Sequence, residues 1–534
     1  MSNTMTANAT AIELAPILAF LAGVGARALG ADSRTLQAGD VFLAYPIING
    51  DGRIVGDGRQ HILAALKQGA SAVIYDPDNF SWPTEFATEF AKTAHLAVPN
   101  LAWHAGEIAN AFYAQPDQAM RTIAVTGTNG KTSCALWLGR AFSRHAPACV
   151  IGTLGVAVLN KGDGEFVANG YTTPDALTLQ NTLLRVRAAG VQTVAMEASS
   201  IGLEQGRMRG MHLDIALFTN LTRDHLDFHG DMAAYEAAKN RLFDWPGLRH
   251  AVVNLDDAMG VRLAHRLAGA VDAGQARVAT IGYTIADDES AVLAAAAWPP
   301  AMQVLRASHL RSRAGGTGGT EFHLSAPQGQ CQVKTRLLGQ FNISNALGVL
   351  GVMLAAGMDF NAAVKAVEAL EAAPGRMQQM GGVDAPLVVV DYAHTPDALE
   401  KTLLALRPVT SERGGQLWCV FGCGGDRDPG KRPQMGAVAQ LADQIMVTSD
   451  NPRSEEPGAI IQQIAQGMSK PTQMMDDRAA AILSAIKHAA KQDVVLIAGK
   501  GHENYQEIKG KKLPFSDTEQ AALALATRPT MRRT

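Results

Sequence analysis

The sequence predicts an α/β protein of three domains, in which a central, mostly parallel, doubly wound sheet is flanked by an N-terminal and a C-terminal α/β domain. Short apolar segments alternate with helical segments along most of the 534 residues, a rhythm typical of parallel sheets covered by helices. A glycine-containing turn at 127–130 joins one of these strands to a helix. A Pro-Gly pair at 374–375 separates two series of strands and marks a hinge. The domains are expected at residues 1–119, 120–371 and 372–534.

The composition is that of a soluble globular protein. Hydrophobic residues make up 47% of the chain and charged residues 18%, which is compatible with large buried cores. The formal net charge of −3 and the absence of a basic run argue against a nucleic-acid partner. Five cysteines without a disulfide pattern indicate reduced thiols in a cytoplasmic protein. The apolar run 14–24 is too short to span a membrane, so a core helix is expected there.

The N-terminal domain is expected to mix short strands and helices. A turn at Gly39-Asp40 leads into a strand at 41–44, a helix covers 62–67 and a strand covers 72–75. No phosphate loop occurs in this part of the sequence, which predicts that the catalytic residues lie elsewhere.

The central domain alternates strands and helices as a doubly wound sheet does. Strands are predicted at 122–126, 149–151, 191–196, 215–219 and 251–254, and helices up to 143, over 177–189 and over 345–356. Ligands of such sheets bind at the carboxyl ends of the strands. The Gly/Thr-rich segment 314–320 is predicted to be a hairpin or flexible turn, because it is too short for a domain linker.

The C-terminal domain repeats the pattern as a Rossmann-like α/β unit, with strands at 387–391, 417–421, 444–448 and 494–498. Each strand ends in a polar segment: Asp391-Tyr392-Ala393-His394, Gly422-Cys423-Gly424-Gly425-Asp426-Arg427-Asp428, Asp450-Asn451-Pro452-Arg453 and Gly499-Lys500-Gly501-His502-Glu503. Four such segments at one sheet edge predict a binding crevice, and their Arg and Asp residues suit a charged, zwitterionic small molecule.

The segment Gly127-Thr128-Asn129-Gly130-Lys131-Thr132-Ser133 has the chemistry of a phosphate-binding loop. Backbone N–H groups at the start of a helix, together with its dipole, attract anions. Lys131 adds a positive charge, and a hydroxyl of Thr132 or Ser133 can reach a Mg²⁺ bound to a triphosphate. The usual pattern has glycine where this sequence has Val125. An ordinary strand–turn–helix with a solvated lysine is therefore the alternative.

Two further polar clusters follow central strands. Met196-Glu197-Ala198-Ser199-Ser200 ends one strand, and the segment 219–229, which contains Asp224-His225, ends another. A carboxylate and an imidazole beside a phosphate loop suit Mg²⁺, which takes few protein ligands besides phosphate oxygens and water. Considered alone, His225 would be interpreted as a capped or core histidine. Lys239, on the next helix, would be interpreted as a solvated surface lysine. The convergence of three clusters favours a site.

These motifs together resemble the Mur ligases over nearly the whole chain. They are Gly127–Thr132, Asp224-His225-Leu226-Asp227, Gly339-Gln340-Phe341-Asn342-Ile343-Ser344-Asn345, Asp391-Tyr392-Ala393-His394 and Gly499-Lys500-Gly501-His502-Glu503. Asp450-Asn451-Pro452-Arg453 is similar to the signature of family members that add diaminopimelate. The resemblance implies an ADP-forming amide ligase of peptidoglycan synthesis, which adds meso-diaminopimelate to UDP-N-acetylmuramoyl-L-alanyl-D-glutamate through an acyl phosphate.

The resemblance also implies a nucleotide site and a metal site. ATP is expected on Gly127, Thr128, Asn129, Gly130, Lys131, Thr132, Ser133, Asn342, Arg376, Asp391 and His394. Mg²⁺ is expected on Thr132, Glu197, His225 and a carbamylated Lys239, because a carbamate supplies an anionic oxygen where a bare ammonium would repel the cation. Lys131, Glu197, His225 and Lys239 would be the catalytic residues.

The two other substrates are assigned in the same way. The UDP-muramoyl-dipeptide is expected to contact Ser33, Thr172, Thr173, Ser199, Gln205 and Arg207. Diaminopimelate is expected to contact Arg427, Asp450, Asn451, Pro452, Arg453, Gly499 and Glu503, with the Arg453 guanidinium on the extra carboxylate that lysine lacks. The segment 45–50 departs from the family's usual uridine-side loop, whereas Asp51-Gly52-Arg53 resembles it.

Other functions fit part of the pattern. Within the same class, the chain would be a lysine-adding or folylpolyglutamate-type amide ligase, but the N-terminal domain and Arg453 argue against both. In a different class, it would be a nucleotide-dependent switch or a transporter ATPase, for which the ligand-rich edge of the last domain is unnecessary. The expected partners are small molecules only, with no nucleic acid and no membrane segment, and a monomer is expected.

Overall fold

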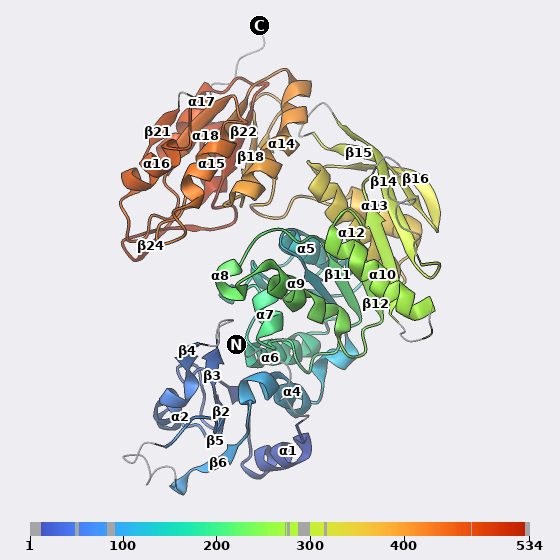
Figure 1. The fold of residues 1–534 in the computed structure, drawn as a ribbon, viewed down its shortest axis with the longest axis vertical. Coiled ribbons are helices and arrows are strands. Elements are labelled where there is room, and N and C mark those ends of the chain that lie inside the picture. The colour runs from blue at the N-terminus through green and yellow to red at the C-terminus, as the bar shows by residue number, and fades with distance from the viewer. Residues whose placement is uncertain are drawn as a thin grey trace. The chain divides into compact units, whose positions relative to one another are not determined.

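The computed structural model describes residues 12–48, 53–82, 91–272, 274, 278–286, 299–313, 318–470 and 472–528. The chain divides into two compact units, residues 1–282 with 297–303 and residues 283–296 with 304–534. Each unit consists of sheets covered by helices (Figure 1), which confirms the predicted α/β class. The predicted boundaries of three domains, at 119/120 and 371/372, stay a prediction.

The first unit begins with a four-stranded parallel sheet in the order β1-β2-β5-β6. Its residues alternate between two cores, because successive side chains of a strand point to opposite faces. Val41 and Leu43 pack with α1 and α4, while Phe42 and Ala44 pack with α2. The elements are α1 (Leu14–Gly23), β1 (Leu29–Gly30), β2 (Val41–Ala44), η1 (Gly58–His61), α2 (Ile62–Lys67), β5 (Ala72–Tyr75), β6 (Ala94–Ala97), α4 (Leu101–Phe112) and η3 (Pro116–Ala119).

The predicted core helix at 14–24, the helix at 62–67 and the strands at 41–44 and 72–75 are all confirmed. A separate hairpin consists of β3 (Pro46–Ile48) and β4 (Ile54–Asp57). The predicted Asp51-Gly52 lies outside the described residues.

The central sheet of the first unit runs in the order β13-β12-β11-β7-β10-β8-β9. Strands β12 to β8 pair in parallel, and β9 is antiparallel to β8. The strands are β7 (Arg121–Thr126), β8 (Ala148–Gly152), β9 (Gly155–Leu159), β10 (Thr193–Glu197), β11 (Ile215–Phe218), β12 (His250–Asn254) and β13 (Ala279–Thr284). The helices are α5 (Lys131–Ser143), α6 (Ala176–Ala188), α7 (Ser200–Glu204), α8 (Leu226–His229), α9 (Met232–Asn240), η4 (Arg241–Asp244) and α10 (Ala258–Asp272).

The strand order reverses at β7, which places a site there. The chain goes from β7 to β8 and β10 on one side, and then returns to β11 and β12 on the other. Where the loops that follow two adjacent parallel strands run in opposite directions, a crevice opens at the carboxyl ends of those strands. The ends of β10, β7 and β11 are therefore neighbours, as the three polar clusters of the sequence predict.

The second unit contains three antiparallel strands, two helices and a separate α/β sheet. Strands β14 (Gln303–Ser312), β15 (Thr320–Ala326) and β16 (Gly329–Thr335) pair antiparallel, followed by α12 (Gln340–Ala355) and α13 (Phe360–Glu368). Strands β14 and β15 flank the predicted turn at 314–320, of which residues 314–317 lie outside the described residues. These three strands do not follow the parallel pattern that the sequence predicts for residues 120–371.

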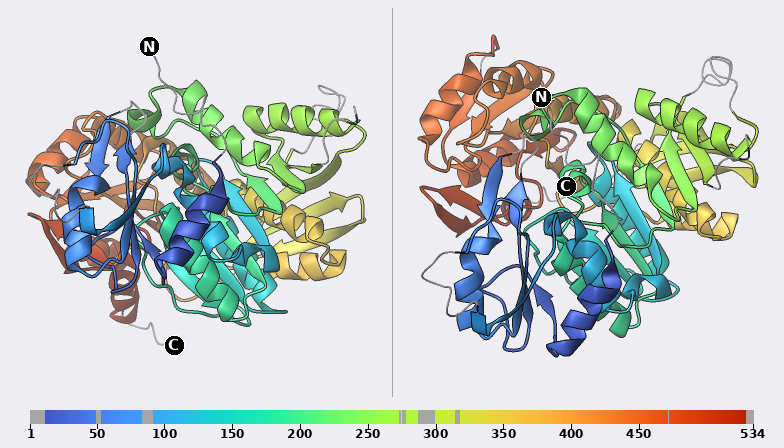
Figure 2. Two further views of the ribbon diagram at one scale, coloured as in Figure 1. Left: turned by 90° about the horizontal axis from the view of Figure 1, so that it is seen from below. Right: turned by 60° about the horizontal axis from the view of Figure 1, so that its bottom comes forward.

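The C-terminal sheet has the order β17-β18-β22-β19-β20-β21, with β17 antiparallel to β18 and the other pairs parallel. Helices α14, α15 and α16 pack on one face, and α17 and α18 on the other (Figure 2). The four strands predicted from the sequence are confirmed. The elements are β17 (Gln378–Gly381), β18 (Leu387–Asp391), α14 (Pro396–Arg413), β19 (Leu417–Phe421), α15 (Lys431–Ala439), β20 (Gln444–Thr448), α16 (Pro457–Ala465), β21 (Gln473–Met475), α17 (Arg478–His488), β22 (Val494–Ala498), β23 (Tyr505–Ile508), β24 (Lys511–Pro514) and α18 (Asp517–Ala526).

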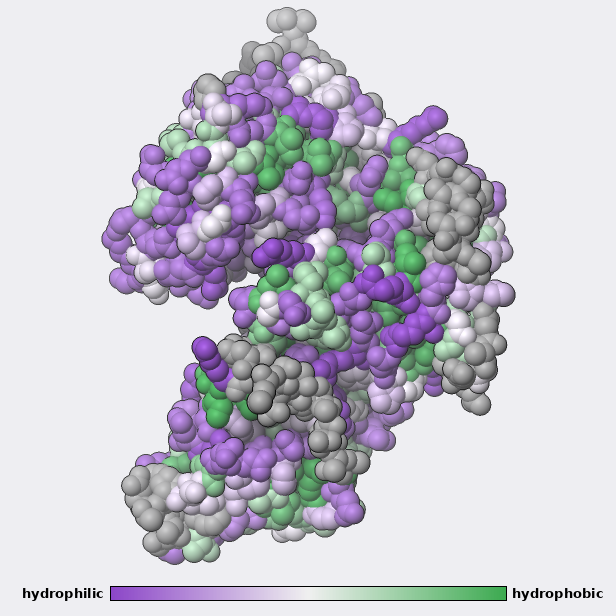
Figure 3. Space-filling model, in the orientation of Figure 1, coloured by the Kyte–Doolittle hydropathy of each residue, from purple (hydrophilic) through white to green (hydrophobic). Residues whose placement is uncertain are grey.

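No helix in the described part of the chain is long and apolar enough to cross a bilayer. On the face shown in Figure 3, hydrophobic residues lie in small groups among hydrophilic ones.

Candidate active site

The predicted phosphate loop lies between β7 and α5 and is hydrogen-bonded to the end of β11. The Thr128 amide donates to the carbonyl of Asn220 (2.8 Å), and the Asn129 amide donates to the Asn220 side-chain oxygen (2.9 Å). Lys131 Nζ donates to the carbonyls of Gly127 (2.8 Å) and Thr128 (2.9 Å). The first N–H groups of α5 have no partner within the helix, so this end of the helix can bind an anion.

Gly127 lets this loop pass close to β11. Its φ is +148°, and a Cβ at this position would lie 1.9 Å from Thr219 Oγ1. Val125, where the usual pattern has glycine, is fully buried inside β7 and pairs with Leu217 and Glu197 on the two neighbouring strands. The loop begins only after the strand has ended, so the valine does not enter it.

Glu197 ends β10 with its carboxylate among neutral donors. The residue is 1% exposed. Its Oε2 accepts from the hydroxyls of Thr132 (3.0 Å) and Thr153 (3.2 Å), and its Oε1 accepts from the Thr153 amide (2.7 Å). In the part of the chain that the structure describes, no cation pairs with this carboxylate. Its charge is therefore available to a bound cation.

Lys239, on α9, is buried rather than solvated. It is 1% exposed, and its Nζ donates to the carbonyl of Gly127 (2.9 Å) and lies 4.3 Å from the centre of the Tyr235 ring. Burial lowers its pKa well below the usual lysine value, the charge of Lys131 adds to the effect, and Asp224 opposes it. The interpretation as a surface lysine is wrong, because α9 packs this side chain against the phosphate loop.

Both histidines after β11 have a lowered pKa, which favours the neutral ring. Burial lowers the pKa of His225, with Lys131 and Lys239 adding to the effect and Asp224 opposing it. The His225 ring centre lies 6.2 Å from that of Tyr235. Burial also lowers the pKa of His229 to about 4. Neutral imidazole nitrogens can bind a metal, which a protonated ring cannot.

Thr132, Glu197, His225 and Lys239 are the predicted magnesium ligands. The described residues contain no group of three or more His, Cys, Asp or Glu side chains that could hold a metal. The contact between Thr132 and Glu197 nevertheless offers one hydroxyl and one carboxylate oxygen. This donor set fits Mg²⁺, which keeps several waters and binds substrate phosphates. The complete ligand set stays a prediction.

Most residues predicted for the UDP-muramoyl-dipeptide form one network. Arg207 donates to the Gln205 side-chain oxygen (2.7 and 3.0 Å) and to the carbonyl of Thr173 (2.7 Å). The Thr173 hydroxyl donates to the Glu197 carbonyl (2.7 Å) and accepts from the Ser199 amide (3.0 Å).

Two further contacts define the extent of this network. Gln205 donates to the carbonyl of Ile48 in the β3–β4 hairpin (3.2 Å), and the hydroxyls of Thr172 and Thr153 lie 3.1 Å apart. Ser33 is buried, and no hydrogen bond between described residues joins it to the network. The predicted residues other than Ser33 are thus connected to Glu197.

The remaining residues predicted for ATP lie in the second unit. Arg376 lies 4.4 Å from the centre of the Tyr392 ring, which is also 4.6 Å from His394. Asp391 is buried, which raises its pKa, and its carboxylate accepts from the Met377 amide (2.7 Å). Asn342 is buried and donates to the carbonyl of Leu338 (2.9 Å). Because the phosphate loop belongs to the first unit, a joint ATP site stays a prediction.

Arg453 occupies the end of the predicted amino-acid loop. Its backbone is left-handed, with a φ of +52°, a conformation that is uncommon outside glycine. Its Nη1 donates to the carbonyl of Gly425 (2.7 Å), and its Nε lies 3.3 Å from Glu507 Oε2. The guanidinium is thus oriented by a neighbouring loop and by β23, with its side chain 20% exposed.

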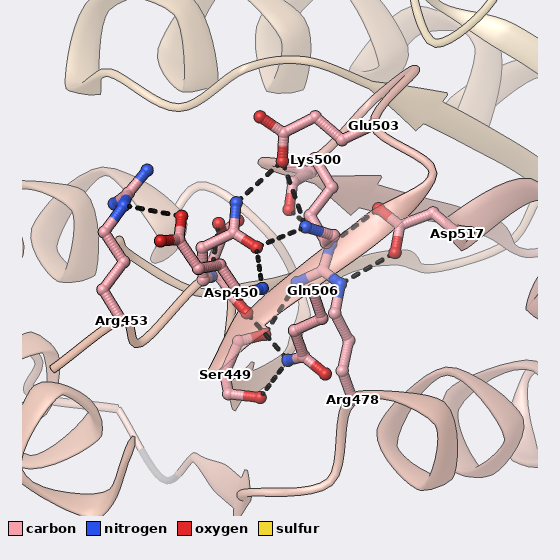
Figure 4. Close-up of polar contacts among 11 residues, drawn as sticks. Ser449, Asp450, Arg453, Arg478, Lys500, Glu503, Gln506 and Asp517 are labelled. Atoms are coloured by element: carbon pink, nitrogen blue, oxygen red, sulfur yellow. Dashed lines mark hydrogen bonds and ion pairs between the residues drawn. The ribbon is translucent and has the colours of Figure 1, made fainter. Parts of the chain in front are cut away.

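Asn451 and Glu503, which are also predicted to bind the amino acid, meet at the buried Lys500. Figure 4 shows Lys500 beside Glu503. Lys500 Nζ donates to Asn451 Oδ1 (2.9 Å) and to Glu503 Oε2 (3.0 Å). The side-chain nitrogen of Asn451, Nδ2, donates to the same Glu503 oxygen (2.8 Å). The Lys500 side chain is fully buried. It fixes the orientation of both partners.

Position 499 requires a glycine, because the segment after β22 approaches the segment after β20 there. Its φ is +117°, and a Cβ would lie 2.5 Å from Asp450 Oδ2. Asp450 and Pro452 are buried, whereas Arg427 is exposed on the loop after β19. Asn451 and Glu503 are therefore linked through Lys500, and Glu507 joins Arg453 to Asn451. The Pro452 carbonyl accepts from the Glu455 amide (3.0 Å), and for Arg427 the structure shows an exposed position on the loop after β19.

Sequence reasoning missed several residues that hold these groups. Thr153 supplies two of the three donors to Glu197, and Arg432 holds Glu455 with two bonds of 2.8 Å beside the loop after β19. Arg478 and Asp517 form a fully buried ion pair at the first turns of α17 and α18. No motif marks these positions, because an arginine or an aspartate in a first helical turn is ordinary.

Known proteins that are similar to this chain include Mur ligases. Residues 125–353 match the family described as Mur ligase middle domain, and residues 375–501 match the Mur ligase, glutamate ligase domain. A UDP-N-acetylmuramoyl-L-alanyl-D-glutamate–2,6-diaminopimelate ligase from Janthinobacterium sp. (strain Marseille) is 58% identical over 97% of this chain and 98% of its own length. The chain belongs to the Mur ligase family.

Other Mur ligases align over a similar length. A ligase of the same name from Pseudomonas aeruginosa is 45% identical, covering 94% of this chain and 95% of its own. A solved structure of that name has a TM-score of 0.63 at 35% identity, covering 94% and 95%. A MurF ligase from Thermotoga maritima in complex with ADP has a TM-score of 0.56 at 16% identity, covering 94% and 97%, which shows a shared fold alone. The resemblance stated from the motifs is confirmed.

Proposed function

We propose that this chain is an ATP-dependent ligase that joins meso-diaminopimelate to UDP-N-acetylmuramoyl-L-alanyl-D-glutamate, in the cytoplasm and as a monomer. Relatives at 58% and 45% identity carry this activity in their names. The observation that carries the proposal is the placement of the phosphate loop, Glu197 and buried Lys239 around the carboxyl end of β7. This arrangement suits the activation of a carboxylate by a triphosphate.

The first step forms an acyl phosphate. The γ-carboxylate of the D-glutamyl residue attacks the γ-phosphorus of ATP in line, and ADP leaves. Lys131 and the N-terminal end of α5 would neutralise the charge that develops on the phosphate oxygens. Magnesium, when bound at Thr132 and Glu197, supplies further positive charge there.

The second step forms the amide bond. The amine of diaminopimelate attacks the acyl carbon, phosphate leaves, and the amine loses a proton. No side-chain nucleophile takes part, so the protein contributes positioning and electrostatic stabilisation.

Lys239 is proposed to carry a carbamate. Carbamate formation needs the neutral amine as nucleophile, and burial beside Lys131 lowers the pKa of Lys239 toward that form. The product replaces a cation by an anion beside the loop that binds phosphate. An anionic oxygen at this point can bind a metal together with Glu197 and His225.

The choice of amino acid is proposed to depend on Arg453 and Glu503. The Arg453 guanidinium, held by Gly425 and Glu507, would bind the carboxylate that distinguishes diaminopimelate from lysine. Only Oε2 of Glu503 bonds to Asn451 and Lys500, so Oε1 would accept from the ammonium group of the amino acid. A site built for two charges rejects a substrate that leaves one unpaired.

The proposal is tested by phosphate release from purified protein with ATP, Mg²⁺ and the UDP-muramoyl-dipeptide, with one candidate amino acid at a time. Diaminopimelate should support turnover and peptide-bond formation, while lysine and glutamate should not. No ATP consumption with diaminopimelate present, or faster turnover with lysine, would contradict the proposal.

The Arg453→Ala variant should lose diaminopimelate selectivity in the same assay. Removal of the charged partner of a carboxylate costs roughly 1.5–3 kcal/mol, so kcat/KM for diaminopimelate should fall by about 10- to 100-fold. The KM for ATP should not change. An unaltered preference for diaminopimelate over lysine would show that another group reads the carboxylate.

A further inference from the structure

Two strand ends of the C-terminal sheet present the proposed amino-acid residues. Strand β20 ends at Thr448, and the segment 449–453 follows; β22 ends at Ala498, and the segment 499–503 follows. Strand β19 lies between β20 and β22 in the sheet. No strand pairing therefore joins the two strand ends directly, so contacts beyond the pairing of each strand with β19 contribute to their relative position.

Asn451 bonds Lys500 and Glu503 through side chains, and Arg478 adds a connection through the backbone of both strand ends. Figure 4 shows Arg478 between Ser449 and Asp517. Its Nη1 donates to the carbonyl of Ser449 (3.2 Å), directly before Asp450, and its Nη2 donates to the carbonyl of Ala498 (3.0 Å), directly before Gly499. One planar guanidinium thus bonds the last backbone carbonyls ahead of both segments. A fixed fork of donors suits this use, whereas a lysine ammonium has its donors at a single point.

Asp517 holds the guanidinium in place. Its two carboxylate oxygens accept from Nε and Nη2 of Arg478, both at 2.7 Å. Both side chains are completely buried, so neither touches solvent or a substrate. Arg478 thus makes four hydrogen bonds, which connect α17 and α18 to the two strand ends.

We propose that Arg478 and Asp517 are positioning residues for the amino acid that this ligase adds. The proposal rests on the proposed function of the Asp450–Arg453 and Gly499–Glu503 segments. Together with the bonds among Asn451, Lys500 and Glu503, the pair sets the spacing between Arg453 on one segment and Glu503 on the other. It thereby contributes to the distance between the two charges of the amino acid that the site accepts. A small error in the position of binding groups is costly, because charge pairing and hydrogen bonding depend steeply on geometry.

The test compares Arg478→Lys with wild type in steady-state kinetics, varying each of the three substrates. Lysine can still pair with Asp517 but cannot reach both carbonyls. The KM for diaminopimelate should rise about tenfold, on the scale of one or two lost hydrogen bonds. The KM values for ATP and the UDP-muramoyl-dipeptide should stay within about twofold of wild type, and the preference for diaminopimelate over lysine should fall.

Arg59→Lys is the matched control for the loss of a buried arginine. Arg59 is also buried, pairs with Asp57 (2.9 Å), and donates to the carbonyls of Asp76 and Asp78 in the first unit. This variant should lose thermal stability to a similar degree with no change in the KM for diaminopimelate. An equal rise of that KM in both variants would mean that general destabilisation explains the effect and would overturn the proposal.

A double variant separates positioning from ion pairing. Replacing a buried pair by apolar residues, as in Arg478→Met/Asp517→Leu, often preserves or raises stability, but the carbonyls of Ser449 and Ala498 lose their donor. The double variant should keep a high Tm, and its KM for diaminopimelate should be higher than that of wild type. A wild-type KM in this variant, or in Arg478→Lys if the double variant does not fold, would overturn the proposal. A wild type that cannot use diaminopimelate would instead contradict the proposed function itself.

Discussion

The molecule contains two buried lysines beside its two candidate sites, and their surroundings differ. Lys239, in the first unit, bonds the carbonyl of Gly127 and faces the ring of Tyr235. Lys500, in the second unit, bonds Asn451 and a carboxylate oxygen of Glu503. Among the described residues, no carboxylate lies within 4 Å of Lys239. One lysine is thus buried with a counter-ion and the other without.

This difference separates a reactive lysine from a structural one. A buried ammonium without a counter-ion is costly, so the group shifts toward its neutral form, and a neutral amine can be modified. A buried lysine that pairs with a carboxylate fixes the geometry of its partners. On the proposed function, the same residue type prepares chemistry in one unit and orients binding residues in the other.

The largest expected effect is on catalysis at Lys239. Lys239→Met should lower kcat for phosphate release by about 10³-fold, comparable to the loss of a strong transition-state stabiliser, because the proposed carbamate cannot form. Lys239→Arg, which keeps a positive charge, should be equally inactive. Added bicarbonate should restore wild type after removal of CO₂, but neither variant. Full activity in Lys239→Met would remove the carbamate from the mechanism.

The next effect is on stability at Lys500. Lys500→Met should lower the free energy of unfolding by about 3 kcal/mol, since it removes the buried ammonium that pairs with the Glu503 carboxylate and donates to the Asn451 oxygen. Tm from thermal unfolding is the measurement. The double variant Lys500→Met/Glu503→Leu serves as the control and should recover much of the lost Tm. An unchanged Tm in the single variant would contradict the structural role of this lysine.

The smallest expected effect is a gain in stability when Lys239 is replaced. In CO₂-free buffer at neutral pH, Lys239→Met should raise the free energy of unfolding by about 1 kcal/mol, because a methionine buries no ammonium. The pKa of Lys239 is lowered in the folded protein, so between this lowered pKa and 10.5 the unfolded chain binds up to one more proton. Wild-type stability should therefore rise with pH in this range, and the gap between the two proteins should narrow toward pH 10. A Tm that falls in Lys239→Met, as in Lys500→Met, would end the comparison.

The elements of the fold follow from local patterns, and most were predictable. The buried strands at 122–126, 215–219 and 494–498 lie within two residues of their predicted ends, because continuous apolar runs bounded by glycine and polar residues have few alternatives. The antiparallel strands β14 to β16 were not predicted. Their alternating, partly exposed residues give a weaker signal than the buried runs do.

The sequence by itself determined the α/β class, the phosphate loop and the four polar strand ends, since each is encoded in a contiguous segment of the chain. Only the tertiary structure decided that Lys239 is buried against Gly127, that Thr153 holds Glu197, and that Arg478 links the carbonyls of Ser449 and Ala498. These contacts join residues from different elements. The burial, charge state and geometry of such a side chain depend on what the fold places around it, and no pattern in its own segment records that.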